Sequence, residues 1–179
     1  MKMTISHHSA IAPISITWDS ETSTIERIGI GDRCAPATGD AEKTSAPASV
    51  AVLQEQLDAY FTDPNFTFTL ECLTLNGLTT FQRHVVDCVC SIPSGQTRSY
   101  AEIAAEAGSP GAARAVGGVM ASNRYPIVIP CHRVITSDGG LGGYTGGLKI
   151  KRSLLSFESE QAFTRTPEFA ASCTLATAI

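Results

Sequence analysis

The residues best suited to covalent chemistry are Cys131 and its neighbour His132, within the run Ile127-Val-Ile-Pro-Cys-His-Arg-Val-Ile135. The run is apolar and predicts a strand, and Pro130 interrupts it, so that Cys131 falls where the chain leaves regular pairing. His132 and Arg133 add positive potential, which favours the thiolate, the nucleophilic form of cysteine. Cys131 is therefore the best nucleophile candidate among the six cysteines, although a Cys-His dipeptide alone is more typical of a buried structural thiol.

A glycine-rich segment follows at residues 138–147, with six glycines in ten positions and with Tyr144 and Thr145 among them. Such a loop exposes its backbone, so its N–H and C=O groups can approach a flat ligand such as a base. The segment lacks the GK[ST] ending of a phosphate-binding loop. A helix at residues 149–157, ending in Glu158, is expected next.

The helix expected at residues 112–122 carries small side chains on one face. At helical spacing this face reads Arg114, Gly117, Gly118 and Ala121. Two interior glycines cost about 1 kcal/mol each relative to alanine, so another interaction must offset the loss. Entry into the DNA minor groove, which is only about 6 Å wide, is one interpretation. Close packing against another helix of the core is an equally good alternative.

The elements that must position these groups follow from hydrophobic periodicity and from turn signals. Residues 14–30 predict a hairpin and residues 33–47 a loop. A helix at residues 49–61, with Ser49 as its cap, and a strand at residues 66–75 complete the first part, which ends at Asn76-Gly77.

The second part opens with Thr80 as the expected N-cap of a helix at residues 81–91. A short helix over residues 99–107, closed by Gly108, precedes the helix at residues 112–122. Two short helices joined by a tight turn make a helix-turn-helix candidate.

Charge is segregated along the chain, although the net charge is only −4. Residues 1–78 hold 4 basic and 10 acidic side chains, residues 79–158 hold 8 and 5, and residues 159–179 hold 1 and 2. No acidic residue lies between Ala107 and Ser137, where Arg114, Arg124 and Arg133 occur. This region is suited to facing phosphates, or else it is a basic surface without a partner.

The six cysteines are irregularly spaced, which argues against a disulfide scaffold and favours thiols in a reducing compartment. Residues 1–12 lack the apolar run of a secretion signal, and no stretch approaches 18 apolar residues, so we expect neither secretion nor membrane insertion. A metal site formed by His7, His8 and Cys34 is an alternative use of one thiol.

Three motifs carry a resemblance. Ile129-Pro-Cys-His-Arg-Val134, preceded by Arg114-Ala-Val-Gly117 and Asn123 and followed by Gly142-Gly-Tyr-Thr-Gly-Gly147, resembles the O6-alkylguanine-DNA alkyltransferase family over about residues 80–158. Two departures concern loop shape: Arg124-Tyr125 follows Asn123 where many relatives have Asn-Pro, and Thr79-Thr80 replaces Thr-Pro.

The resemblance implies an α/β (α+β) fold with two domains. Residues 1–78 would form a small N-terminal sheet with helices, of ribonuclease H-like type. Residues 79–158 would form a helical, winged-helix-like domain that contains the helix-turn-helix. Residues 159–179 have no counterpart and would be a tail of unknown role.

The resemblance also implies DNA repair without a cofactor or metal, by irreversible single-turnover transfer of an alkyl group from O6 of guanine to Cys131. O4-alkylthymine is an additional candidate substrate. His132 would be the base that deprotonates Cys131 through a water, and Glu158 would orient His132. Asn123 would tie the active-site segment together, and Tyr100 would crowd the target's phosphate.

The implied partner is double-stranded DNA, bound in the minor groove with the damaged base flipped out, by a monomer in the cytoplasm, or in the nucleus of a eukaryote. Arg114 would enter the duplex in place of the flipped nucleotide. The groove-facing positions would be Ala112, Ala113, Ala115 and Gly117, and the guanine pocket would be lined by Met120, Val134, Tyr144 and Thr145.

Three competing functions remain to be weighed. In non-catalytic relatives that bind alkylated guanine, the acceptor cysteine is replaced, so Cys131 argues against that class. A Cys-His hydrolase or acyltransferase needs an oxyanion hole and does not explain the small-residue stripe. A helix-turn-helix regulator normally presents Arg, Gln or Asn to the major groove, not Gly and Ala.

Overall fold

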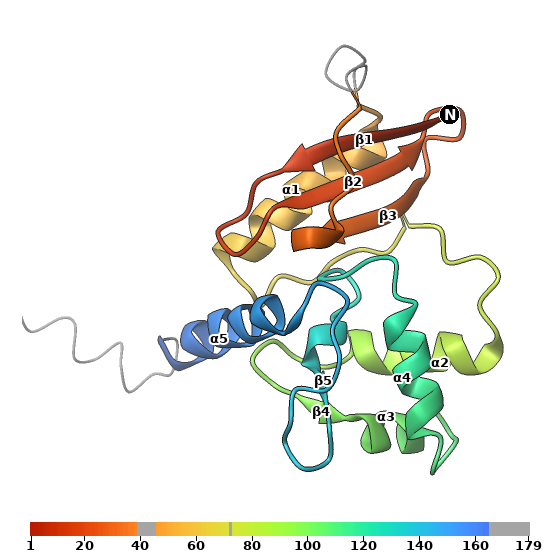
Figure 1. Ribbon diagram of the computed structural model, residues 1–179, viewed down its shortest axis with the longest axis vertical. Coiled ribbons are helices and arrows are strands. Elements are labelled where there is room, and N and C mark those ends of the chain that lie inside the picture. Colours follow the sequence, from red (N-terminus) through yellow and green to blue (C-terminus); the bar gives the residue numbers. More distant parts are fainter. Residues whose placement is uncertain (39–45, 72, 165–179) are drawn as a thin grey trace, which may run out of the picture.

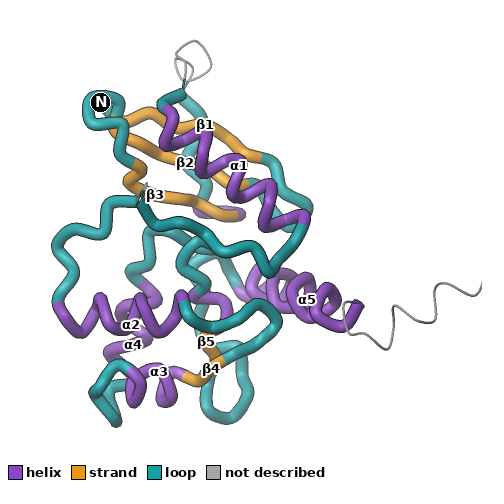
Figure 2. Tube along the Cα trace, turned by 180° about the vertical axis from the view of Figure 1, so that it is seen from behind, coloured by secondary structure: helices purple, strands orange, loops and turns teal. Residues whose placement is uncertain are grey.

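The computed structural model describes residues 1–38, 46–71 and 73–164, with side chains as far as Glu160. Its N-terminal half, residues 1–78, holds an antiparallel sheet of β1 (Lys2–His7), β2 (Ile14–Asp19) and β3 (Ile25–Ile30), in that order. Helix α1 (Ala48–Thr62) covers one face of the sheet, as Figures 1 and 2 show from opposite sides. The predicted hairpin is confirmed, and β1 is an additional edge strand.

Burial of apolar side chains holds α1 on the sheet. Ile14, Ile16 and Trp18 of β2 are buried, as are Leu53 and Leu57 of α1. Each large apolar side chain that is fully buried contributes about 1.5–3 kcal/mol. The predicted Ser49 cap is wrong, because the helix starts after Pro47 without a side-chain cap and the Ser49 hydroxyl donates to the Ser23 carbonyl oxygen at 2.6 Å.

In the described residues 66–71 and 73–75, the strand predicted at residues 66–75 is not formed. Its described part contributes one isolated parallel bridge, between Leu73 and Ile25. A side chain takes the place of a partner strand here, because the Gln56 amide pairs with Thr69, accepting from its backbone N–H at 2.8 Å and donating to its hydroxyl at 3.0 Å. Phe68 packs on Tyr60 of α1, with ring centroids 5.6 Å apart.

The C-terminal half is mainly helical. Its helices are α2 (Thr80–Cys90), α3 (Tyr100–Glu106), α4 (Ala113–Ala121) and α5 (Leu148–Thr164), and β4 (Arg98–Ser99) pairs in parallel with β5 (Val134–Ile135). Thr79, not the predicted Thr80, caps α2 through a capping box with Gln82. Gly108 closes α3 with a φ of +77°, a conformation that favours glycine, and the two short helices predicted on either side of this turn are α3 and α4.

Helix α5 lies where the two halves meet (Figure 1). It continues to Thr164, so Glu158 lies inside the helix and not at its predicted end; residues 165–179 of the predicted tail fall outside the described residues. The halves are joined by hydrogen bonds, including those from the Tyr125 hydroxyl to the carbonyl oxygens of Ile25 and Thr74.

No helix in the described part of the chain is long and apolar enough to cross a membrane. The architecture is therefore mixed α and β, and the division at residue 78 stays a prediction.

Candidate active site

A tight turn places Cys131. Pro130, at φ −79° and ψ 58°, sits at the centre of an inverse γ-turn in which the Cys131 N–H donates to the Ile129 carbonyl oxygen at 2.7 Å. Cys131 then begins the 3-10 helix η2 (Cys131–Arg133), so the predicted break in regular pairing at Pro130 is present, but of the strand predicted over residues 127–135 only Val134–Ile135 is formed. Ile127, just upstream, is buried with a φ of +76°, which is strained for a β-branched residue.

Asn123 holds this turn from the end of α4. Its side-chain amide nitrogen lies 3.0 Å from the Ile129 carbonyl oxygen and 3.1 Å from the Cys131 Sγ. Its side-chain oxygen accepts from the Tyr125 N–H at 2.9 Å. One amide therefore ties together three points of the segment around the thiol.

His132 and Glu158 form a fully buried pair. The His132 Nε2 lies 2.9 Å from the Glu158 Oε1, and both side chains have no exposed surface. Burial lowers the pKa of His132 more than Glu158 raises it, so the ring is neutral at pH 7. A carboxylate only accepts hydrogen bonds, which places the ring proton on Nε2 and leaves Nδ1 as a bare acceptor. Nδ1 has no hydrogen-bond partner among the described residues.

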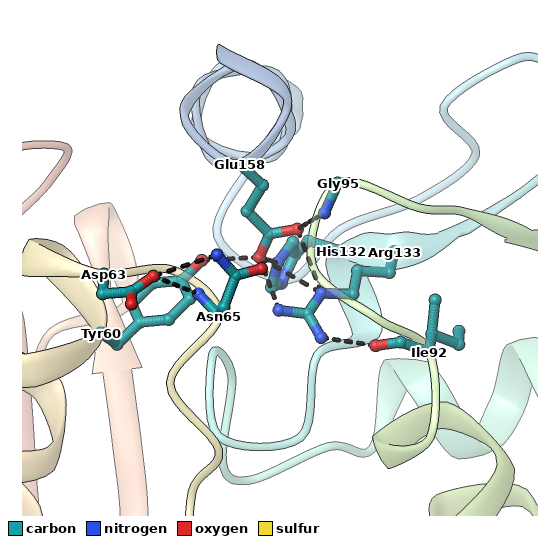
Figure 3. Close-up of polar contacts among 8 residues, drawn as sticks. All are labelled: Tyr60, Asp63, Asn65, Ile92, Gly95, His132, Arg133 and Glu158. Atoms are coloured by element: carbon teal, nitrogen blue, oxygen red, sulfur yellow. Dashed lines mark hydrogen bonds and ion pairs between the residues drawn. The ribbon is translucent and has the colours of Figure 1, made fainter. Parts of the chain in front are cut away.

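Glu158 is held by donors from both halves of the protein (Figure 3). The Arg133 guanidinium donates to it from Nη2 at 2.8 Å, the Tyr60 hydroxyl at 2.8 Å and the Gly95 N–H at 3.2 Å. Burial alone would raise the pKa of Glu158, but the bonds from His132 and Arg133 lower it to about 2. Glu158 is therefore a carboxylate throughout the physiological range.

Arg133 does not act as the sequence indicated. It is buried, its charge is neutralised by Glu158, and its Nη1 donates to the Ile92 carbonyl oxygen at 2.6 Å. It is thus not available to phosphates. The expectation that His132 and Arg133 favour the Cys131 thiolate is also wrong: burial raises the pKa of Cys131, against smaller lowering effects of Asn123 and Lys151. The resting group is a protonated thiol.

Sequence analysis missed two buried polar residues at this site, Lys151 and Tyr60. Lys151 Nζ donates to the carbonyl oxygens of Val134 at 2.6 Å, of Leu141 and of Gly143 at 3.4 Å, which joins η2 and β5 to the glycine-rich loop. Burial lowers the pKa of Lys151 to about 8. Spacing offered a signal for Lys151, because it shares a helical face with Leu154 and Glu158; none pointed to Tyr60.

The Cys131 side chain lines a cavity of about 410 Å³. Of the residues singled out in the sequence, Tyr100, Gly117, Met120, Tyr144 and Thr145 line it as well. Val134, expected to line the pocket, is fully buried and does not line the cavity. Burial and the neighbouring Cys131 raise the pKa of Tyr100, which therefore remains a hydrogen-bond donor at neutral pH.

The small-residue face of α4 is open. A Cβ placed on Gly117 or Gly118 would meet nothing within 4 Å, which contradicts the alternative of close packing against a core helix. Arg114 and Ala115 are exposed on this helix, whereas Ala112 and Ala113 are half-buried. The buried face consists of Val116, Val119 and Met120.

The alternative metal site is not formed. His7 Nε2 lies 3.4 Å from Asp58, whereas the Cys34 thiol donates to the Pro13 carbonyl oxygen at 3.1 Å. Among the described residues, no group of three His, Cys, Asp or Glu side chains could hold a metal ion.

Comparisons with known proteins agree with these features. A family model described as the DNA-binding domain of 6-O-methylguanine DNA methyltransferase matches residues 80–160. A protein of Methanothermobacter thermautotrophicus named methylated-DNA--protein-cysteine methyltransferase is 44% identical over 115 residues, 64% of this chain and 64% of that protein. A Mycobacterium leprae protein of the same name is 46% identical over 132 residues, 69% of this chain and 79% of that protein. The crystal structure of Mycobacterium tuberculosis OGT in complex with DNA matches with a TM-score of 0.70 and 38% identity, covering 88% of this chain and 93% of that one.

Proposed function

The chain belongs to the O6-methylguanine-DNA methyltransferase family, and on that premise we propose that it repairs DNA by transferring an alkyl group from O6 of guanine to its own Cys131. One observation carries the proposal: the Cys131 thiol lines a cavity and is followed directly by His132, a neutral histidine backed by a buried carboxylate. A non-catalytic relative would have no use for this arrangement.

His132 is the base that activates the thiol. Its bare Nδ1 accepts the Cys131 proton through a water molecule, and the imidazolium that forms is stabilised by Glu158. Because burial raises the pKa of Cys131, the thiolate forms only when this acceptor is in place. Asn123, at 3.1 Å, supplies a hydrogen bond to the sulfur.

The thiolate then attacks the alkyl carbon. A sulfur–carbon bond forms, the carbon–O6 bond breaks, and the bonding pair stays on guanine. The departing guanine takes up one proton. The Tyr100 hydroxyl, in the cavity wall, donates a hydrogen bond to this guanine. The net reaction exchanges the alkyl group of guanine for the proton of the thiol, and the thioether product is not a target for water.

DNA binds with its minor groove on α4. The exposed face around Gly117 and Gly118 is slender enough to enter the groove, and Arg114 replaces the nucleotide that rotates into the cavity. Tyr100 crowds the phosphate of that nucleotide. One protein molecule serves one lesion, so no second protomer is required.

Arg114→Ala should slow repair of duplex DNA about 10- to 100-fold, because extruding a stacked base costs a few kcal/mol. Reaction with free O6-benzylguanine should change far less, since that base starts unstacked. Quenched single-turnover assays on both substrates measure the two rates. Arg152→Ala, which removes the same charge from an exposed position on α5, is the matched control. Equal losses on both substrates would exclude Arg114 from base extrusion.

Stoichiometry tests the proposed function. With excess O6-methylguanine DNA, repaired guanine should level off at one equivalent of protein, and mass spectrometry should find the methyl group on Cys131. The alkylated protein should melt at a lower temperature, because overpacking a close-packed site costs about 1–3 kcal/mol. Several turnovers without added thiol would contradict the mechanism, whereas an unchanged melting temperature would contradict only the packing argument.

A further inference from the structure

Two arginines of the N-terminal half line the cavity that holds Cys131. Arg27 lies on β3, and Arg33 ends the 3-10 helix η1 (Gly31–Arg33) that follows it. Both side chains are exposed, whereas Cys131, which lines the same cavity, is only 4% exposed. The N-terminal half therefore forms part of the cavity rim.

Close contacts fix this segment against the C-terminal half. A Cβ on Gly146 would lie 2.8 Å from Ile30 Cγ2, and a Cβ on Gly31, whose φ is +61°, would overlap Ile150 Cδ1. The φ of Gly31 favours glycine, and a side chain at Gly146 would force its neighbours to shift. On the other side, the Ile28 N–H donates to the Arg124 carbonyl oxygen at 2.8 Å. The backbone that carries Arg27 and Arg33 is held in place beside the cavity.

The charge of these two arginines is not matched by an ion pair among the described residues. Residues 1–78 hold 10 acidic and only 4 basic side chains: Lys2, Arg27, Arg33 and Lys43. Lys2 pairs with Glu26 at 2.7 Å, and Lys43 lies outside the described residues. In the part of the chain that the structure describes, neither Arg27 nor Arg33 forms an ion pair. The acidic N-terminal half therefore contributes two guanidinium groups without an ion pair to the rim of the cavity that Cys131 lines.

We propose that Arg27 and Arg33 bind phosphates of the DNA strand next to the extruded nucleotide, so that the N-terminal half is part of the DNA-binding surface. This inference rests on the proposed function. When a base occupies the cavity with its alkyl group at the buried Cys131 sulfur, its sugar and phosphates must remain at the mouth, where the two arginines lie. A guanidinium group suits this position because it can bind two phosphate oxygens at once. An anionic group on the alkyl adduct is a less suitable ligand for the two arginines than a DNA phosphate, because the adduct would point toward the Cys131 sulfur.

The salt dependence of binding tests this directly. Each phosphate contact contributes about 0.9 to the slope of log affinity against log salt. Arg27→Ala/Arg33→Ala should therefore flatten the slope by about 2 and weaken duplex binding at low salt by at least about ten-fold, on damaged and undamaged DNA alike. Arg27→Lys/Arg33→Lys should keep most of the slope and recover part of the affinity. Fluorescence anisotropy over a salt series gives both quantities, and thermal melting confirms that each variant is folded.

Lys2→Ala is the matched control, because it removes a positive charge from the same half, in a pair with Glu26. It should leave the slope at the wild-type value. A slope unchanged in the double alanine variant would overturn the inference, as would a loss confined to O6-carboxymethylguanine relative to O6-methylguanine DNA, which would assign the arginines to an anionic adduct. Binding to damaged DNA is measured in the Cys131→Ser background, where no transfer occurs, so an absence of Cys131 alkylation in the wild type would overturn the proposed function and leave this comparison decisive.

Discussion

Cys131→Ser should abolish alkyl transfer and leave binding to O6-methylguanine DNA nearly unchanged. A hydroxyl fits the space of the thiol and keeps the bond to Asn123, but it is a far weaker nucleophile than a thiolate. We expect the rate to fall below detection, and radiolabelled methyl transfer together with gel-shift binding measures both properties.

A second cysteine provides the control for this variant. Cys88 lies half-buried on α2, does not line the cavity, and burial raises its pKa. Cys88→Ser should react at the wild-type rate. Alkyl transfer by Cys131→Ser at an appreciable rate, with the label on another cysteine, would remove Cys131 from its role.

Glu158→Gln should lower both the rate and the stability strongly. Removing the charge of Glu158 leaves the buried Arg133 guanidinium without its carboxylate, and breaking a buried ion pair from one side costs about 3–5 kcal/mol. The substitution also removes the carboxylate that stabilises the His132 imidazolium. We therefore expect the transfer rate to fall on the order of 10²-fold. The double variant with His132→Ala should be barely slower than the slower single variant, because residues of one relay are not additive.

The stability loss of Glu158→Gln should depend on pH in a defined direction. The pKa of Glu158 is lowered to about 2 in the folded protein, so its contribution is complete above the unfolded pKa, about 4.3, and is lost as the pH falls toward 2. The difference in melting temperature between wild type and variant should therefore be largest near neutral pH and shrink below about pH 4. Thermal melts across that range measure it.

Tyr60→Phe is the matched control for this pH effect. It removes one hydrogen bond to the same carboxylate but leaves the charge of Glu158 in place. The ring, which packs on Phe61, Phe68 and Phe157, is kept. We expect a loss of about 1.5–3 kcal/mol with the acid sensitivity of the wild type retained. An equal, pH-independent loss in both variants, together with additive rate losses, would mean that Glu158 serves only to stabilise its helix.

Local signals in the sequence were sufficient for most helices. Ser99 with Glu102 and Gly108 bracket α3, and alternating isoleucines mark β2, because capping, turn formation and one-sided burial depend on residues close in sequence. The failures fall where a distant side chain competes with the backbone pattern. Residues 66–75 look like a strand, but Gln56 pairs with Thr69. Ser49 looks like a helix cap, but its hydroxyl donates to the distant Ser23 carbonyl oxygen.

The sequence by itself identified the candidate nucleophile and the slender helix, because both are carried by residues adjacent in the chain or one helical turn apart. Only the tertiary structure decided the protonation state and the charge of the residues at the site. Glu158 is 26 residues from His132 and 98 from Tyr60, and it neutralises Arg133 and sets the tautomer of His132, while burial leaves Cys131 a protonated thiol. Arg27 and Arg33 reach the same cavity from the other half of the protein. Burial and long-range pairing control the pKa and charge of a group, and neither is encoded in the spacing of neighbouring residues.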